Sequence, residues 1–186
     1  MHLVLASASP RRAELLAAAG YTFEVLPVDV NEEVLEGESP SAYVERLANV
    51  KAAAGLAQRP GAIVLGADTA VVVAGGRILG KARDEGEARD ILLELSGRTH
   101  DVLTGVAAHR AGGQWSAVAC TTVQFAPLSG TDLDWYLASG EWRDKAGAYG
   151  VQGRAGRFIP QIDGSYSNVV GPPVALVFHL LRQAGL

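Results

Sequence analysis

The sequence has a single cysteine, Cys120, which excludes an internal disulfide and every zinc site built on cysteine pairs. Its four histidines include no pair at metal-ligand spacing. No apolar run approaches the roughly 18 residues that span a membrane, and no charged, apolar and small-residue leader opens the chain. We therefore expect a cytoplasmic protein that contacts no membrane.

Charge is also scarce. Charged residues make up 19% of the chain and the net charge is −4, which argues against a general nucleic-acid binder. An anionic ligand would therefore need a local basic cluster. Apolar residues make up 48% of the sequence and no linker divides it, so we predict one domain over residues 1–186. The oligomeric state stays open, a homodimer included.

Short apolar runs alternate with amphipathic patterns, which is typical of an α/β fold. The strand patterns are "HLVLAS", "YTFEVL", "AIVLGA", "TAVVVA", "HDVLTGVAAH" and "SAVACTTVQF". Helical patterns begin after Ser9 and cover about 40–58, 85–95, 130–139 and 173–184. The last two strand runs are joined by "RAGGQW", which suits a hairpin. We therefore predict a mixed, twisted sheet with flanking helices.

The stretch "SPRR" predicts a helix start with Ser9 as the N-cap and Pro10 at the first helical position. Arg11 and Arg12 then lie at the end of the helix where the dipole is already positive. One interpretation is a surface helix end with two solvated arginines. The alternative is a polyanion site, in which the helix start, both guanidiniums and the Ser7 and Ser9 hydroxyls bind a phosphate chain.

Asp68 and Thr69 interrupt a run that is otherwise apolar from Ala62 to Ala74. A buried carboxylate there must be paired, hydrogen-bonded or metal-bound, because an isolated charge is costly in a core. At the end of a core strand it could bind Mg²⁺ or take a proton from water. The alternative is a turn-forming aspartate next to Gly66.

Two lysines are candidates for anion binding. Lys51 falls inside the apolar stripe of the helix expected at about 40–58, so its stem should lie against the core. Its ammonium either reaches solvent or binds a ligand. Lys81 ends "GGRILGK", which is close to a Walker loop, but Ala82 stands where serine or threonine should be. We read this segment as a hairpin instead.

The glycine-rich stretch "GEWRDKAGAYGVQGRAGRFIPQIDGSYSNVVGPP" has six glycines between Gly140 and Gly164. Such a loop lets the backbone approach a ligand closely, although a long surface excursion has the same composition. No helix pattern follows its glycines, so a dinucleotide fingerprint is not expected.

Six blocks resemble the Maf family of nucleoside triphosphate pyrophosphatases, in order along nearly the whole chain. They are "LASASPRRAELL", "GADTAVVV", "GKARD", "SGRTHDVLTGV", "DKAGAYGVQG" and "GSYSNVVGPP". The resemblance implies an α/β fold like that of inosine triphosphate pyrophosphatases, with two lobes around a cleft. It also implies hydrolysis of a nucleoside triphosphate to monophosphate and pyrophosphate with a divalent metal, Mg²⁺ or Mn²⁺.

The resemblance makes Asp68 the proton acceptor and, with Glu32, a metal ligand. The residues that it assigns to the phosphates are Ser7, Arg11, Arg12, Lys51 and Lys81. Within the family, the combination of Arg12, Thr69 and Gln152 is similar to the subgroup that acts on dTTP and UTP, whereas another branch acts on 7-methyl-GTP. Ala82 and Pro172 replace the usual proline and leucine, and neither change removes a functional side chain.

Two other functions stay open at this stage. One, which the family resemblance implies, is a nucleotide-binding regulator of septum formation that does not turn its ligand over. The other is a nucleotide-binding kinase. Asp68 together with Lys51 and Lys81 favours turnover, because a pure binder needs no base beside the phosphates. Ala82 argues against the kinase.

Overall fold

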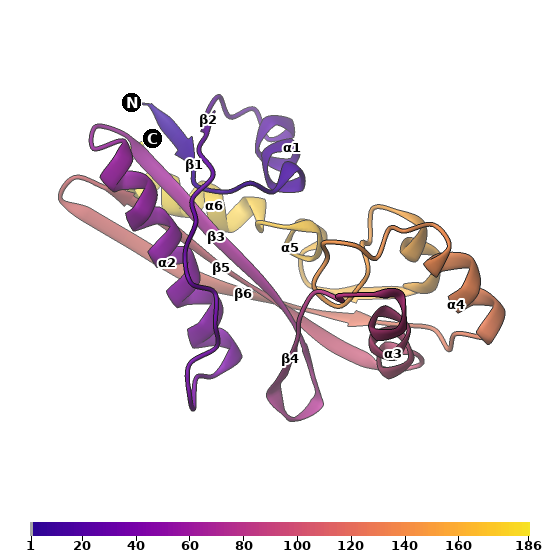
Figure 1. The fold of residues 1–186 in the computed structure, drawn as a ribbon. Helices are drawn as coiled ribbons and strands as arrows, with labels where there is room; N and C mark the ends of the chain where they lie inside the picture. The colour runs from indigo at the N-terminus through magenta and orange to yellow at the C-terminus, as the bar shows by residue number, and fades with distance from the viewer. Residues whose placement is uncertain (1) are drawn as a thin grey trace. The chain divides into compact units, whose positions relative to one another are not determined.

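The computed structural model describes residues 2–186, and its helices and strands are drawn in Figure 1. Contacts divide the chain into two compact units. The first comprises the chain up to Thr69, Leu103–Ala119 and Gly171–Leu186; the second comprises Ala70–Val102 and Cys120–Val170. The family resemblance predicts two lobes, whereas the prediction of a single domain stays a prediction.

The helices and strands follow one another along the sequence in the order given next. The elements are β1 (Leu3–Leu5), α1 (Pro10–Ala18), β2 (Glu24–Val25), α2 (Pro40–Gln58), β3 (Ile63–Val73), η1 (Ala74–Gly76), β4 (Arg77–Leu79), α3 (Glu85–Leu95), β5 (Thr99–Arg110), β6 (Gly113–Gln124), α4 (Gly130–Leu137), η2 (Arg154–Phe158), β7 (Gln161–Asp163), α5 (Tyr166–Val170) and α6 (Val174–Gln183).

The sheet combines parallel and antiparallel strands, which confirms the predicted mixed α/β fold. Its strand order is β2-β1-β3-β5-β6-β7, and β4 pairs with β3. Strand β1 runs parallel to β2 and β3, whereas the β3–β4 and β6–β7 pairs are antiparallel. The runs on either side of Asp68 form one strand rather than two, because Asp68 and Thr69 both keep the extended conformation of β3. The turn interpretation of Asp68 is therefore wrong.

In the first unit, α2 packs closely on β3 and β5. A Cβ atom at Gly66 would lie 2.6 Å from the backbone nitrogen of Ala52, and one at Gly105 would lie 2.8 Å from that of Glu45. Only glycine fits at these two strand positions, because real Cβ atoms do not approach backbone so closely. The two glycines therefore bring the turn of α2 that carries Lys51 directly onto the sheet.

The apolar core of the first unit packs helices α1 and α6 against its strands. Helix α1 begins at Pro10 with Ser9 as its N-cap, as expected. The core gathers side chains from β1, α1, β3, β5 and α6: Leu3, Leu5, Leu16, Ile63, Leu65, Val106, Val177, Leu180 and Leu181. These side chains hold β3, which carries Asp68 and Thr69 in its middle, against β1 and β5.

The second unit contains the glycine hairpin and the glycine-rich loop. Gly75 and Gly76 have φ values of 81° and 79°, a conformation that favours glycine, and they connect antiparallel β3 and β4. This confirms the hairpin and the rejection of the Walker loop. A separate core packs here, with Leu92, Leu95, Phe125, Leu133, Tyr136, Leu137, Trp142 and Phe158. Within residues 2–186, no helix has the length and apolar character to cross a membrane.

Candidate functional site

The start of α1 is positively charged. Ser7 is 6% exposed, and its hydroxyl oxygen accepts from the backbone N–H of Ser9 and from Nη1 of Arg12, both at 3.2 Å. The Ser9 side chain caps nothing, and the first turn has no acidic residue. With Arg11 beside Arg12, this helix start suits an anion such as a phosphate. The polyanion interpretation of "SPRR" stays a prediction for Ser7 and the two arginines.

Arg12 connects α1 to the strands. Its Nη2 donates to the hydroxyl of Thr69 at 3.4 Å, and the Thr69 hydroxyl lies 3.0 Å from that of Thr104. Burial lowers the pKa of the Arg12 guanidinium from its usual value, although the carboxylate of Asp68 opposes this shift. An arginine stays charged in either case. The two residues that the resemblance assigns to specificity in the first unit are therefore in contact.

Lys51 lies between two carboxylates. Its Nζ is 2.6 Å from Oδ1 of Asp68 and 2.6 Å from Oε1 of Glu32. Only 9% of the Lys51 side chain and 11% of the Asp68 side chain are exposed, so each charge needs the other. The stem of Lys51 lies against the core, as predicted. The alternative in which the ammonium reaches solvent is wrong, because the carboxylates hold it.

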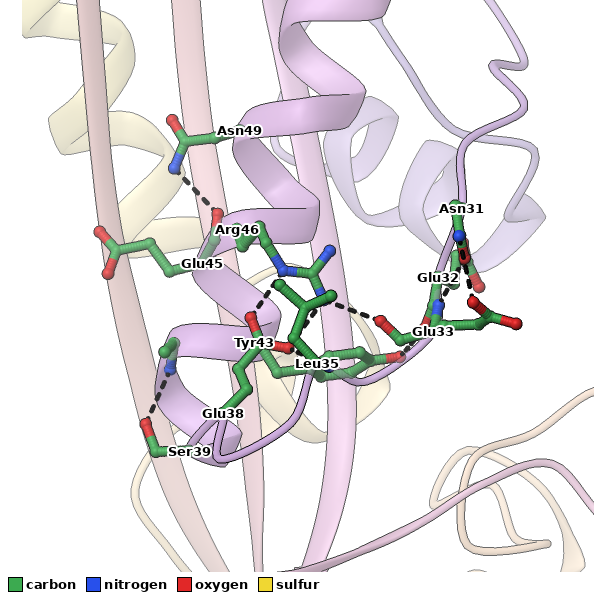
Figure 2. A network of polar contacts seen from close by, with 11 residues as sticks. Asn31, Glu32, Glu33, Leu35, Glu38, Ser39, Tyr43, Glu45, Arg46 and Asn49 are labelled. Carbon is green, nitrogen blue, oxygen red and sulfur yellow. Dashed lines mark hydrogen bonds and ion pairs between the residues drawn. The ribbon is translucent and has the colours of Figure 1, made fainter.

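The loop that presents Glu32 is tied to α2 (Figure 2). Tyr43 Oη donates to the backbone carbonyl of Glu32 at 3.0 Å, and Nη2 of Arg46 donates to that of Glu33 at 2.9 Å. Arg46 also binds both carboxylate oxygens of Glu38, at 2.6 and 2.7 Å. This bidentate pair lowers the pKa of Glu38 to about 2. The main chain at Glu32 is thus anchored to the helix that carries its lysine partner.

Glu32 and Asp68 have the donor chemistry for a divalent cation. Mg²⁺ in nucleotide enzymes commonly takes one or two carboxylates and completes its shell with substrate phosphates and waters. Across residues 2–186, no group of three or more histidine, cysteine, aspartate or glutamate side chains is arranged to hold a metal. The two carboxylates share the Lys51 ammonium, and both also interact electrostatically with Arg12. They therefore fit a metal that arrives with a substrate better than a resident structural ion.

Lys81 and Gln152 belong to the second unit, and both are exposed. Lys81 forms a β-bridge with Ala146, and the N–H of Gly147 donates to the carbonyl of Gly80 at 3.1 Å. The "GKAR" segment and the glycine-rich loop are thus hydrogen-bonded to each other, with Ala82 in place of proline. Gln152 lies on a turn of the same loop system.

A buried aromatic cluster supports the glycine-rich loop. His100 is 4% exposed, and its Nε2 lies 2.8 Å from Oη of Tyr149, whose ring also packs edge-on against Phe125. Burial lowers the pKa of His100 to about 4, so the ring is neutral at physiological pH. Its Nδ1 is buried without a hydrogen-bond partner among the described residues. The neutral ring and its tyrosine partner fix the loop three residues before Gln152.

Several of these residues escape the sequence analysis. Tyr43 and Arg46 are three residues apart on α2, a spacing that places them on one helix face and could have marked them as a pair. Thr104 and His100 both lie inside the quoted block "SGRTHDVLTGV", but nothing in the pattern shows which side chains they meet.

Comparison with known proteins agrees with the sequence blocks. A family model described as "Maf-like protein" matches residues 2–184. A dTTP/UTP pyrophosphatase of Anaeromyxobacter dehalogenans (strain 2CP-C) is 51% identical over 187 residues, covering 98% of this chain and 94% of that protein. A dTTP/UTP pyrophosphatase of Symbiobacterium thermophilum is 51% identical over 183 residues, with the same coverage of 98% and 94%. One of Cereibacter sphaeroides is 49% identical over 187 residues, covering 100% of this chain and 96% of that protein.

Among solved structures, the Staphylococcus aureus Ham1 protein aligns with 68% of this chain and 72% of its own, at a TM-score of 0.49 and 16% identity. That likeness is too low to add to the assignment. The family model and the relatives cover nearly the whole chain. On this evidence the chain belongs to the Maf-like protein family.

Proposed function

We propose that this chain hydrolyses nucleoside triphosphates, with dTTP and UTP preferred, to the nucleoside monophosphate and pyrophosphate. The names of its relatives, at 51% and 49% identity over nearly the full length, support this reaction. The structural observation that carries it is the cluster of Glu32, Lys51 and Asp68 in the same unit as the basic start of α1. That unit combines a candidate carboxylate base, a lysine hydrogen-bonded to it and candidate anion-binding groups.

In the proposed reaction, Asp68 accepts a proton from the water that attacks the α-phosphorus and displaces pyrophosphate. Lys51 holds the Asp68 carboxylate in the free protein through their 2.6 Å hydrogen bond. Phosphate oxygens of an arriving substrate compete for the same ammonium. Substrate binding therefore weakens the ion pair and leaves an Asp68 oxygen able to accept a proton.

The phosphates are proposed to bind Ser7, Arg11, Arg12 and the N–H groups at the start of α1. For Lys81 and Gln152 we adopt the roles that the resemblance gives them, phosphate binding and base recognition. A divalent cation, Mg²⁺ or Mn²⁺, held by Glu32 and Asp68 would neutralise charge on the leaving pyrophosphate.

The test is a panel of nucleoside triphosphates, including dTTP, UTP, CTP, GTP and 7-methyl-GTP, assayed for pyrophosphate release with Mg²⁺ or Mn²⁺ and with EDTA. We expect release from dTTP and UTP, with metal only. Preference for 7-methyl-GTP would move the chain to the other branch of the family. Tight nucleotide binding without release would instead favour a regulator that does not turn its ligand over.

A further inference from the structure

A chain of hydrogen bonds runs from Arg12 into the core of the first unit. Arg12 Nη2 donates to Oγ1 of Thr69 at 3.4 Å, and Oγ1 of Thr69 lies 3.0 Å from Oγ1 of Thr104. Thr104, on β5, is 0% exposed, and its hydroxyl donates to the backbone carbonyl of Gly171 at 3.3 Å. All four residues belong to the first unit.

The donors and acceptors along this chain can be assigned. A carbonyl oxygen only accepts, so the Thr104 hydroxyl is the donor in its contact with Gly171, and a hydroxyl has a single proton to give. Either hydroxyl could be the donor in the Thr69–Thr104 contact. When Thr104 gives its proton to Gly171, Thr104 accepts from Thr69 and Thr69 is the donor. Arg12 is a donor only, which agrees with its contact to the Thr69 oxygen. In this arrangement every hydrogen bond of the series is donated in the same direction, from Arg12 toward Gly171.

We propose that Thr104 is a positioning residue that makes Thr69 act only as a hydrogen-bond acceptor toward the nucleotide. The Thr69 proton is used inside the protein, and one of its two lone pairs accepts from Arg12, so one acceptor position remains for a ligand. The group that this position recognises is an N–H or O–H donor of the nucleotide. The inference rests on the proposed function, because it places a nucleotide at Thr69.

A donor of this kind has two sources in dTTP, the imide N–H of the base and the sugar hydroxyl. N3-methyl-dTTP lacks the first and 2′,3′-dideoxy-TTP lacks the second. One analogue lacks the donor that Thr69 recognises. For the wild-type protein, we expect its kcat/KM to be about two- to tenfold lower than that of the other analogue, the range for one hydrogen bond. The analogue with the smaller loss of kcat/KM keeps the donor that Thr69 recognises, so the comparison shows whether that donor is on the base or on the sugar.

Thr104→Val keeps the shape of the side chain and removes the hydroxyl, whereas Thr104→Ser keeps the hydroxyl. We expect the discrimination against the donor-lacking analogue to fall toward unity in Thr104→Val and to persist in Thr104→Ser. In a Thr69→Val background, Thr104→Val should change discrimination no further, because it acts through Thr69. A residue with a purely structural role would lower the melting temperature of Thr104→Val and leave discrimination unchanged, which overturns the proposal.

A neutron structure of the perdeuterated wild-type protein tests the direction of the chain without any turnover. We expect the deuteron of Thr69 to point at Thr104 and that of Thr104 to point at Gly171. A deuteron on Thr104 that points at Thr69 overturns the proposal. If the wild-type protein releases no pyrophosphate from any nucleotide, the proposed function fails by that result, while the neutron structure still decides the hydrogen-bond direction.

Discussion

Lys51 on α2 and Asp68 on β3 form a buried ion pair of 2.6 Å at the point where Gly66 lets the helix lie against the strand. The pair depends on packing as well as on charge, because a side chain at Gly66 would displace the helix. Glu32 reaches the same ammonium at 2.6 Å from a loop. The candidate base, its cationic partner and the second carboxylate are thus brought together by one close helix–strand contact.

Removing Lys51 should destabilise the protein. Lys51→Met leaves Asp68 buried without its cation, and we expect the free energy of unfolding in urea to fall by about 3–5 kcal/mol. The double variant Lys51→Met/Asp68→Asn, which removes both charges, should recover part of that loss. Gln58→Met, at an exposed position of the same helix, is the control and should change stability little. A single Lys51→Met variant as stable as the wild type would contradict the ion-pair account.

The Arg46–Glu38 pair should make the stability of the folded protein depend on pH in the acidic range. Its hydrogen bonds lower the pKa of Glu38 from 4.5 to about 2. The folded state therefore binds this proton less readily than the unfolded state, so the stabilisation is complete above about 4.5 and is lost as pH falls toward 2. In Glu38→Gln, the decrease of melting temperature across this window should be smaller than in the wild type. Identical decreases would show that the pair does not act in solution.

His100 should cause a second, separate pH dependence of stability, at higher pH than the Arg46–Glu38 pair. Burial lowers its pKa from 6.5 to about 4, so the unfolded chain gains a proton across this window while the folded chain does not. Stability should therefore decrease as pH falls from 6.5 to 4, by on the order of 3 kcal/mol. His100→Gln removes this titration, and its stability should be flatter over the same range. Denaturant unfolding at closely spaced pH values measures the difference, and parallel curves for the two proteins would refute the assignment.

Gln152 is the candidate for base recognition. An amide held in one orientation accepts from the imide N–H of thymine or uracil and donates to a ring carbonyl. Gln152→Ala should weaken dTTP and UTP hydrolysis by roughly ten- to hundredfold and narrow their advantage over CTP. Gln124→Ala, at an exposed amide on β6, serves as the control. An unchanged preference in Gln152→Ala would place base recognition elsewhere.

The sequence predicts much of what local chemistry determines. The Ser9–Pro10 start of α1 and the helix at Pro40–Gln58 follow from capping residues and apolar spacing. The hairpin at Gly75 follows from the need for a positive φ. The buried stem of Lys51 follows from its place in the apolar stripe of α2.

What the sequence does not predict depends on contacts between distant segments. The sequence does not show whether the Lys51 ammonium reaches solvent or is bound, because its partners, Asp68 on β3 and Glu32, are distant in the sequence. Glu32 in turn looks like an ordinary exposed loop residue until Tyr43 is seen to hold its backbone. The role of Thr104 is hidden for the same reason: its partner Thr69 is 35 residues away in the sequence.

In the proposed reaction Asp68 promotes attack of water on the α-phosphorus, and one isotope experiment tests this role directly. Wild-type protein and Asp68→Asn are incubated with dTTP and metal in ¹⁸O-labelled water, and the products are analysed by mass spectrometry. We predict label in dTMP and none in pyrophosphate for the wild type, with no turnover by Asp68→Asn although it still binds dTTP. Label in pyrophosphate, or near-normal turnover by Asp68→Asn, would contradict the account.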